Sequence, residues 1–494
     1  MNILLVYPRF PDTFWSFKHA LSFIQKKASS PPLGLATVAA LLPKSWIKRL
    51  IDLNIEYLSD ETILWADMVF VSAMVVQRAS TREVIQRSKS AGKMVVAGGP
   101  IFLGEWQDFP EVDHFVLNEG EITLPLFLSD LEKGTLKRVY ETDQYADMTT
   151  TPTPLWELVK FSAYDSLSIQ YSRGCPFNCD FCNITAMLGH RPRTKTAQQI
   201  VAELDRMVQL GWRRNIFFVD DNFIGNRRQL KEEILPAIIQ WRKGKRIGSF
   251  ITEASINLAD DDELMQLMSD AGFSSVFVGI ETPDEASLKE CNKGQNLHRN
   301  LVDSVRRLQQ FGLQVMGGFI VGFDNDTPGI FQRQIDFIQN SGIVTAMVGM
   351  LQAPYGTQLY ARMESEGRIL KEMTGDNADG STNIVPKMGA DRLKKGYQSL
   401  MDDLYGTRLF YERVKTFLRV YNPPRVGSLI HTEEILAFFQ SIWKLGILGA
   451  ERREYWRLFF WALLKYPRKF AMAITFTIYG YHFRQINQVN SATA

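Results

Sequence analysis

The sequence predicts an α/β protein of 494 residues in three parts. Short apolar runs alternate with amphipathic stretches over residues 1–140, which indicates a doubly wound, flavodoxin-like domain. A second series of six such βα units occupies residues 166–384. From residue 385 to 494 the pattern becomes helical and aromatic, and a linker rich in proline and threonine is expected at 141–165.

In the first domain, five buried strands are expected with three helical stretches between and after them. The expected strands are 3–7, 49–52, 68–72, 94–97 and 114–117, and the expected helices are 33–42, 81–91 and 124–133. Ligands of such sheets bind outside the carboxyl ends of the strands. Those ends read 72–76, 98–100 and 118–121 here, with glycines in the second and third.

In the second series, the strands are short and apolar, and amphipathic stretches separate them. The expected strands are 167–170, 215–219, 249–254, 275–280, 317–321 and 346–351, and the clearest helices are 197–210, 261–271 and 297–311. Chemistry on parallel barrels takes place at the carboxyl ends of the strands.

The C-terminal part carries apolar residues at helical spacing in 397–409, 433–448, 455–464 and 470–481. A helical cap on the barrel mouth is the first interpretation. Because aromatic and basic residues mix in 456–461, an element that lies on a membrane surface or lines an apolar substrate channel is the alternative.

Composition limits the partners. The formal net charge of +2 and the lack of a long basic run argue against a nucleic-acid partner. No stretch reaches the roughly 20 uninterrupted apolar residues that cross a bilayer. The chain begins directly with a buried strand and has only four cysteines, so a cytoplasmic location is expected, with contact to the inner membrane as a further option.

Three of the four cysteines, Cys175, Cys179 and Cys182, lie within eight residues. Thiolates at this density select soft metals or iron–sulfur clusters, and a cluster with three protein ligands keeps one iron open for substrate. A structural zinc site, with Cys291 or His190 as the fourth ligand, is the alternative. Cys291 alone is interpreted as a packing residue.

The Cys-x3-Cys-x2-Cys spacing, with Phe181 before the last cysteine, resembles the signature of radical S-adenosylmethionine enzymes. The resemblance implies a 4Fe-4S cluster on the three thiolates, with S-adenosylmethionine on the fourth iron and cleavage to a 5'-deoxyadenosyl radical. It also implies that the six βα units form a partial (β/α)6 TIM-like barrel.

Polar residues follow four successive barrel strands, where carboxylates and amides can hold S-adenosylmethionine through charge-assisted hydrogen bonds. Helix capping is the simpler explanation for each residue alone. By resemblance, Glu281 matches a ribose contact, the segment 317–322 flanks adenine, and Asp220 or Asp221 replaces the family's usual Gly-Gly-Glu. The candidate residues are Asp220, Asp221, Glu253, Ser255, Glu281 and Gly318.

The N-terminal domain, placed before such a signature, resembles the cobalamin-binding domain of a subclass of the family. The glycines at its strand ends let a planar ligand approach, although a tight turn would also explain them. The candidate cobalamin-binding residues are Ser72, Met74, Gly98, Gly99, Pro100, Glu119 and Gly120. The Asp-x-His-x-x-Gly motif is absent after the first strand, so a base-off cobalamin without histidine on cobalt is expected.

The resemblance implies a cobalamin-dependent radical S-adenosylmethionine methyltransferase that methylates an unactivated carbon of a small molecule, with a reductant such as ferredoxin or flavodoxin. The chain is similar to hopanoid C-2 methylases and to tetrapyrrole methylases, and its aromatic C-terminal part favours an apolar, polycyclic substrate such as a hopanoid. Another radical reaction, such as ring formation or contraction, would use the same residues. A non-enzymatic cobalamin-binding regulator with a structural zinc site is the alternative of another class. No residue that acts on substrate is identified.

Overall fold

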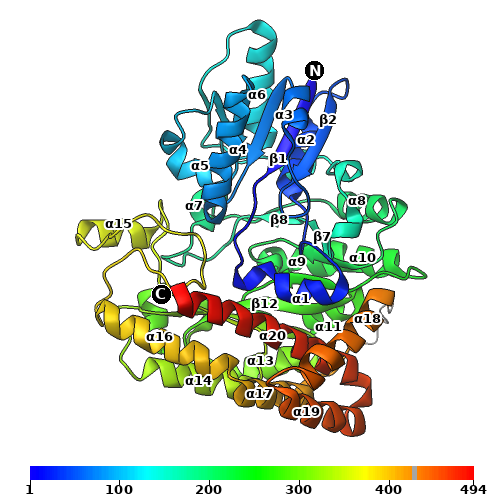
Figure 1. Ribbon diagram of the computed structural model, residues 1–494, viewed down its shortest axis with the longest axis vertical. Helices are drawn as coiled ribbons and strands as arrows, with labels where there is room; N and C mark the ends of the chain where they lie inside the picture. The colour runs from blue at the N-terminus through cyan, green and yellow to red at the C-terminus, as the bar shows by residue number, and fades with distance from the viewer. Residues whose placement is uncertain (425–430, 494) are drawn as a thin grey trace.

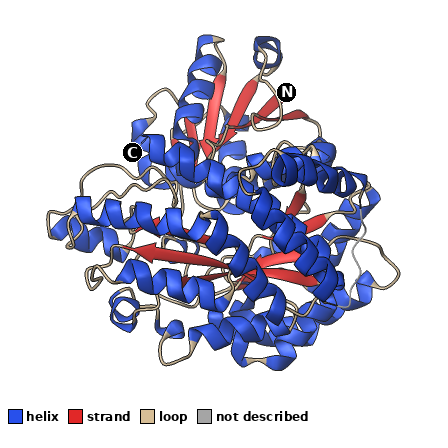
Figure 2. Cartoon of the chain, turned by 60° about the horizontal axis from the view of Figure 1, so that its bottom comes forward, coloured by secondary structure: helices blue, strands red, loops and turns tan. Residues whose placement is uncertain are grey.

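A computed structural model describes residues 1–424 and 431–493. Two six-stranded parallel sheets form its framework, one in the N-terminal domain and one in the centre of the chain (Figure 1). Figure 2 shows the strands of both sheets in red, with blue helices on the outside. The predicted fold class is confirmed, while the limits of the domains remain a prediction.

The N-terminal sheet has the strand order β2-β1-β3-β4-β5-β6. Its strands are β1 (Asn2–Tyr7), β2 (Ile47–Asp52), β3 (Met68–Ser72), β4 (Met94–Gly98), β5 (His114–Val116) and β6 (Val139–Tyr140). The five predicted strands are all present. The sequence did not predict β6, because two residues are too short to show a pattern.

Helices cover both faces of this sheet, and each face has its own apolar core. Leu4, Val69 and Ile85 belong to the core beneath α3, α4 and α5, whereas Leu5 and Leu35 belong to the core beneath α2 and α6. The helices are α2 (Leu33–Leu41), α3 (Asp60–Trp65), α4 (Arg78–Ser90), α5 (Pro100–Glu105) and α6 (Gly120–Lys133). Alternate side chains of each strand therefore point to opposite, buried faces.

The central sheet has the order β14-β13-β12-β11-β10-β7, so β7 and β14 are unpaired edges of a partial barrel. Its strands are β7 (Ser166–Ile169), β10 (Asn215–Phe218), β11 (Phe250–Glu253), β12 (Phe273–Glu281), β13 (Gln314–Val321) and β14 (Ala346–Met350). The outer helices are α8 (Ala197–Gln209), α10 (Leu235–Arg242), α11 (Asp262–Ala271), α13 (Leu301–Gln310), α14 (Ile330–Ser341) and α15 (Gln358–Ser365). The six predicted βα units are thus confirmed.

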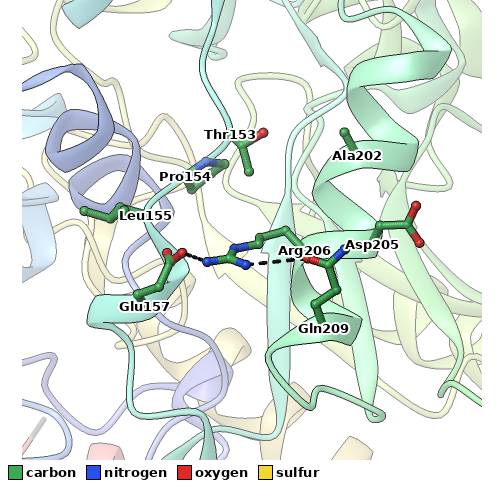
Figure 3. Close-up of a pocket in the computed structure, with 8 residues that line it drawn as sticks. All are labelled: Thr153, Pro154, Leu155, Glu157, Ala202, Asp205, Arg206 and Gln209. Atoms are coloured by element: carbon green, nitrogen blue, oxygen red, sulfur yellow. Dashed lines mark hydrogen bonds and ion pairs between the residues drawn. The ribbon is translucent and has the colours of Figure 1, made fainter. Parts of the chain in front are cut away.

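The expected linker packs closely on its neighbours. Trp156 and Tyr164 are fully buried, and the Leu155 N–H donates to the Ala36 carbonyl at 2.9 Å. Figure 3 shows Arg206 of α8 reaching Glu157 of this segment across a shallow surface hollow. This hollow lies on the outside of α8, away from the carboxyl ends of the barrel strands.

Residues 11–30, which we call the N-terminal strap, leave the first domain and pack on the barrel and the last helix. They contain α1 (Lys18–Leu21) and the short turns η1 (Phe14–Ser16) and η2 (Ser22–Ile24). Phe14 stacks on Phe483 at 4.2 Å, and His482 Nε2 donates to the Phe14 carbonyl at 3.0 Å. The strap shows no clear periodicity, and the sequence did not predict it.

The C-terminal helices pack on α14 and on the strap, and α20 crosses the barrel beside α1 (Figure 1). They are α16 (Ala390–Tyr405), α17 (Thr407–Val420), α18 (Thr432–Ser441), the π-helical turn η12 (Ile442–Ile447), α19 (Arg452–Lys465) and α20 (Phe470–Thr493). The predicted helix 397–409 is in fact two helices, α16 and α17, that meet at Gly406. Among the described residues, no helix is long and apolar enough to span a membrane.

The buried contact between the strap and α20 should make stability depend on pH. Burial lowers the pKa of His482 to about 4, whereas an unfolded histidine titrates near 6.5. Protonation therefore favours the unfolded chain, and this group's contribution is present above pH 6.5 and is lost as pH falls to about 4. The loss corresponds to about 3 kcal/mol at 1.36 kcal/mol per pKa unit.

We expect His482→Gln to flatten the fall in unfolding free energy between pH 6.5 and 4, measured by chemical denaturation. The amide can still donate to the Phe14 carbonyl but does not titrate. His114→Gln, at the start of β5, is the control and should keep the wild-type slope. An unchanged slope in His482→Gln would contradict the assignment.

Candidate functional site

Four charged side chains join the carboxyl edge of the N-terminal sheet to the first loop of the barrel. Arg173 contacts Glu119 and Glu121, each at 2.8 Å, and Arg193 contacts Glu119 at 2.7 Å. All four side chains are at most 17% exposed. Burial opposes the ionisation of Glu121, but hydrogen bonds and the charge of Arg173 outweigh it and lower its pKa. We call these residues the interdomain charge cluster.

The cysteine loop begins and ends at a small antiparallel ribbon of β8 (Ser172–Arg173) and β9 (Arg193–Thr194). The two arginines of the interdomain charge cluster are paired residues of this ribbon. Gly174 follows with φ +93°, and a Cβ there would lie 2.8 Å from the Arg191 carbonyl oxygen. A left-handed glycine therefore allows the chain to turn into the loop.

The three clustered cysteines are half-buried, reduced and close enough to influence one another electrostatically. Burial raises the pKa of Cys182 to about 12 and also raises that of Cys175. Metal binding would displace these protons, because thiolates are the ligands. Among the described residues, no set of three His, Cys, Asp or Glu side chains has the arrangement of a site for a single metal ion.

Donors and a cation surround the sulfurs. Asn222 Nδ2 lies 3.9 Å from Cys175 Sγ, and Gln295 Nε2 lies 3.8 Å from Cys179 Sγ. Burial alone would lower the pKa of Lys293, but the negative charges of Glu281 and Cys179 outweigh it and raise that pKa. Amide donors and a fixed positive charge suit an anionic iron–sulfur cluster on the three thiolates, so the residues present fit this group.

Cys291 does not join the triplet as an exposed ligand. It is fully buried, and its thiol donates to the Leu288 carbonyl at 3.6 Å. Its neighbours Phe323, Leu351 and Leu359 form a separate apolar cluster. Its own carbonyl accepts from the Asp180 N–H at 3.2 Å, so Cys291 packs beneath the loop.

The carboxylate of Asp220 has a structural role. It accepts from the Ser172 hydroxyl at 2.6 Å, from the Ser172 N–H, and from the Tyr171 N–H at 3.2 Å. It is fully buried, and burial raises its pKa to about 7. Asp220 therefore fixes the backbone that enters the cysteine loop and has little capacity left for a ligand.

Asp221 and Glu253 differ from Asp220 in having no such partners. Within residues 1–424 and 431–493, no other side chain donates to either carboxylate. Burial raises the pKa of Asp221 to about 6, and burial together with the charges of Asp221 and Asp220 raises that of Glu253 to about 8. Two carboxylates in this state favour the arrival of a cation.

The remaining barrel candidates lie in two places. Ser255 Oγ donates to Asn257 Oδ1 at 2.7 Å, and its N–H donates to Asn222 Oδ1 at 3.2 Å, so it orients the amide beside Cys175. Glu281 has φ +63° at a register shift between β12 and β13, and its carboxylate contacts Lys293 Nζ at 2.7 Å. The sequence did not identify Lys293, because only the folded structure brings it against Glu281.

Gly318 and its neighbours define an apolar interior of the barrel. A Cβ at Gly318 would lie 2.7 Å from the Phe277 ring, so glycine makes room for that ring. Trp15 of the strap contacts Phe277 at 5.4 Å, and its Nε1 lies 2.8 Å from Met347 Sδ. The sequence did not identify Trp15, because it lies far from the barrel along the chain.

Two glycines of the N-terminal domain serve close backbone packing. A Cβ at Gly98 would lie 2.7 Å from the Val116 carbonyl oxygen. Gly99 has φ +97°, and a Cβ there would lie 2.7 Å from Ser72 Oγ. Pro100 follows as the first residue of α5. The two glycines, Ser72 and Pro100 therefore form one tight junction. This agrees with the tight turn that was the alternative explanation of the glycines.

The other cobalamin candidates lie around this junction. Met74 is 47% exposed, a Cβ at Gly120, the first residue of α6, would lie in ordinary contact 3.9 Å from the Val38 side chain, and Glu119 belongs to the interdomain charge cluster. The neighbouring loop meets the barrel, since a Cβ at Gly375 would lie 2.6 Å from the Val76 N atom. A large planar ligand at these strand ends would thus sit between the domain and the cysteine loop, which fits cobalamin in position.

Comparisons with known families agree with this arrangement. Residues 169–338 match the radical SAM superfamily, and residues 357–493 match a domain of unknown function, DUF4070. The chain is 39% identical to an uncharacterized methyltransferase of Synechocystis sp., over 99% of this chain and 92% of the relative. It is 34% identical to the hopanoid C-2 methylase of Rhodopseudomonas palustris, over 92% of this chain and 88% of the relative.

Solved structures share the fold at low sequence identity. The cobalamin-dependent S-adenosylmethionine radical enzyme OxsB, solved with aqua-cobalamin and S-adenosylmethionine, aligns with a TM-score of 0.63 and 16% identity, over 98% of this chain and 84% of its own. The radical S-adenosylmethionine methyltransferase TsrM from Kitasatospora setae aligns with a TM-score of 0.58 and 16% identity, over 92% and 98%.

The interdomain charge cluster should be costly to break. Arg173→Met leaves Glu119 with Arg193, but it leaves the buried Glu121 with the Thr151 hydroxyl and no cation among the described residues, and we expect a loss of about 3–5 kcal/mol in unfolding free energy. Chemical denaturation of the anaerobic protein measures this loss. The control, Arg228→Met, removes an exposed pair with Glu232 and should cost under about 0.5 kcal/mol. Equal losses in the two variants would refute the structural role of the cluster.

Proposed function

Because this chain belongs to the radical S-adenosylmethionine superfamily, among relatives that include the hopanoid C-2 methylase, we propose that it is a cobalamin-dependent C-methyltransferase. Its substrate is a small, apolar, polycyclic molecule such as a hopanoid. The observation that carries the proposal is the meeting of three thiols, two carboxylates that accept from no other described side chain, and an apolar barrel interior beside the strand ends of a second parallel sheet.

We assign the 4Fe-4S cluster to Cys175, Cys179 and Cys182. Bound iron–sulfur cluster and cobalamin would supply the electron and the methyl carrier for radical methyl transfer from S-adenosylmethionine. The chain contributes the amide donors Asn222 and Gln295, which orient and partly neutralise the sulfurs. A cluster held by three protein ligands would leave one iron open for S-adenosylmethionine.

Asp221 and Glu253 are our candidates for the positively charged part of S-adenosylmethionine. Asp220, the other option for the ammonium group, is already saturated by Tyr171 and Ser172. Glu281 is held by Lys293, so a ribose contact there would be shared with a cation. Gly318 lies on the strand expected beside adenine, where it keeps the barrel interior open around Phe277.

Cobalamin would occupy the strand ends that include Ser72, Met74, Gly98, Gly99, Pro100, Glu119 and Gly120. None of the six histidines of the sequence lies in the segments 72–76, 98–100 or 118–121. We therefore keep the assignment of a base-off form without histidine on cobalt. Glu119 would act indirectly, because its carboxylate holds the two arginines of the cysteine loop.

The barrel interior supports an apolar substrate. Trp15 contacts both Phe277 and Met347 there, and a polycyclic hydrocarbon would bury its surface against these side chains at about 25 cal/mol per Å². A hopanoid suits this lining and agrees with the 34% identical relative. A tetrapyrrole is the second candidate, because two bacteriochlorophyllide methyltransferases of Chlorobaculum tepidum are 24% and 23% identical.

We further propose a cytoplasmic enzyme that draws electrons from a reductant such as ferredoxin or flavodoxin and contacts the inner membrane peripherally. The reductant is proposed because the cluster needs an external electron. The membrane contact is proposed because an apolar substrate partitions into lipid.

Expression in a hopanoid producer tests the proposed reaction. Deuterium from methyl-labelled S-adenosylmethionine should enter the hopanoid fraction, and anaerobic protein should release 5'-deoxyadenosine. The variant Cys175→Ala/Cys179→Ala/Cys182→Ala should do neither, because the cluster loses all its ligands. Product from the triple variant, or wild-type protein that never releases 5'-deoxyadenosine, would overturn the proposal. Label in tetrapyrroles instead would select the second candidate.

The two neighbouring aspartates should behave differently. Asp221→Asn removes a charge that contacts the ligand, and we expect S-adenosylmethionine to bind about ten- to a hundredfold more weakly to the reconstituted protein by isothermal titration calorimetry. Asp220→Asn should chiefly lower stability, because the Ser172 and Tyr171 N–H groups lose a charged acceptor. Weaker binding in Asp220→Asn and normal binding in Asp221→Asn would reverse our assignment.

A further inference from the structure

We propose that α18, η12 and α19 form a docking surface for an anionic lipid bilayer. Large apolar side chains on these elements point into solvent, with exposed fractions between 42% and 80%. We call them the interfacial face: Ile435, Leu436, Phe439, Trp443, Ile447, Leu448, Phe460, Leu463 and Leu464. Scattered exposed apolar residues are ordinary, but nine of them on three consecutive elements require a partner surface.

The spacing of these residues shows that the interfacial face is one side of two amphipathic helices. Phe439, Trp443 and Ile447 follow each other four residues apart along α18 and η12, as do Phe460 and Leu464 along α19. The opposite sides are already satisfied within the chain, since the residues there are buried. These buried residues are Ala437, Ser441, Leu445, Tyr455, Leu458 and Ala462.

Aromatic contacts and a hydrogen bond join the two helices. Trp456 Nε1 donates to the Gly446 carbonyl at 2.9 Å, and a Cβ at Gly446 would lie 3.0 Å from the Tyr455 ring. The Phe438 and Phe459 rings lie 6.2 Å apart. The interfacial face is therefore carried by a packed pair of helices and keeps its shape without a partner.

The charged side chains around the interfacial face indicate which partner binds there. Residues 432–469 contain seven basic side chains, Lys444, Arg452, Arg453, Arg457, Lys465, Arg468 and Lys469, and four acidic ones, Glu433, Glu434, Glu451 and Glu454. Three of these acidic groups are paired with cations, Glu433 with Lys26 at 3.7 Å, Glu451 with Arg484 at 2.6 Å and Glu454 with Arg457 at 2.5 Å, so the surface keeps an excess of positive charge. Cations around an apolar, aromatic face are the pattern of helices that lie in the headgroup region of anionic membranes.

A second copy of this chain is a less suitable partner. A twofold contact would bring the same surface against itself, so the excess of positive charge would repel its own image. An anionic bilayer attracts those charges and also receives the apolar side chains.

The strap connects the helices of the interfacial face to the barrel interior. Lys444 lies over the Phe23 ring at 4.6 Å, and Lys26 lies 3.7 Å from Glu433 at the start of α18. The same strap carries Trp15 to Phe277 inside the barrel. Docking would thus place the lipid close to the segment that lines the interior. Only this last step rests on the proposed function, because it assumes that the substrate is dissolved in the membrane.

Vesicle flotation of the full-length, cluster-loaded protein tests the surface. We expect the wild type to float with vesicles of phosphatidylcholine and phosphatidylglycerol, and to float less with phosphatidylcholine alone or at high salt. Lys444→Glu/Arg453→Glu should weaken binding to the anionic vesicles by roughly tenfold or more. Phe439→Ser/Trp443→Ser/Phe460→Ser should weaken binding to both kinds of vesicle.

The matched control is Tyr57→Ser/Leu64→Ser, which removes two apolar side chains, 72% and 60% exposed, from the N-terminal domain. It should float like the wild type, and circular dichroism and cluster absorbance should be unchanged in all variants. Wild-type protein that stays at the bottom, or interfacial variants that float like the control, would overturn the proposal. So would a wild-type dimer that becomes monomeric in the aromatic variant without any flotation. Flotation is measured without turnover, so failure to methylate would not affect it.

Discussion

The interdomain charge cluster holds the carboxyl edge of one parallel sheet against the loop that leaves the first strand of the other. Together with the packed linker, it fixes the cysteine loop relative to the strand-end loops of the N-terminal domain. Glu119 alone contacts both Arg173 and Arg193, and these two arginines are paired across the ribbon that closes the cysteine loop. Buried charges contribute less to stability than apolar packing would, but they tolerate only one arrangement of their partners.

Much of the fold could be predicted, because strands buried on both faces leave continuous apolar runs such as Ile3–Val6. The cysteine triplet could be predicted because its ligands are neighbours in sequence. The strap could not, because its contacts with Phe483 and Phe277 replace any local pattern. The short strand β6 was missed for a related reason: its two residues are defined by the strand beside them.

The candidate site could be located from the sequence, but the roles of its residues could not be separated. Asp220 and Asp221 are neighbours of the same type. Only the tertiary fold decides that Asp220 accepts three hydrogen bonds from Tyr171 and Ser172, while Asp221 accepts from no other described side chain. The sequence predicted Glu281 as a ribose contact, but only the folded structure brings Lys293 against its carboxylate. The relatives agree with an enzyme and give no support to a non-enzymatic regulator held together by zinc.

The contact of Phe14 with His482 joins positions 468 residues apart, almost the whole length of the chain. During synthesis on the ribosome, α20 emerges after the strands of both sheets, so the strap lacks this packing partner until the C-terminal helices have been made. Contacts of such long range form late. The strap is therefore expected to settle after both parallel sheets, although it is synthesised before all but one of their strands.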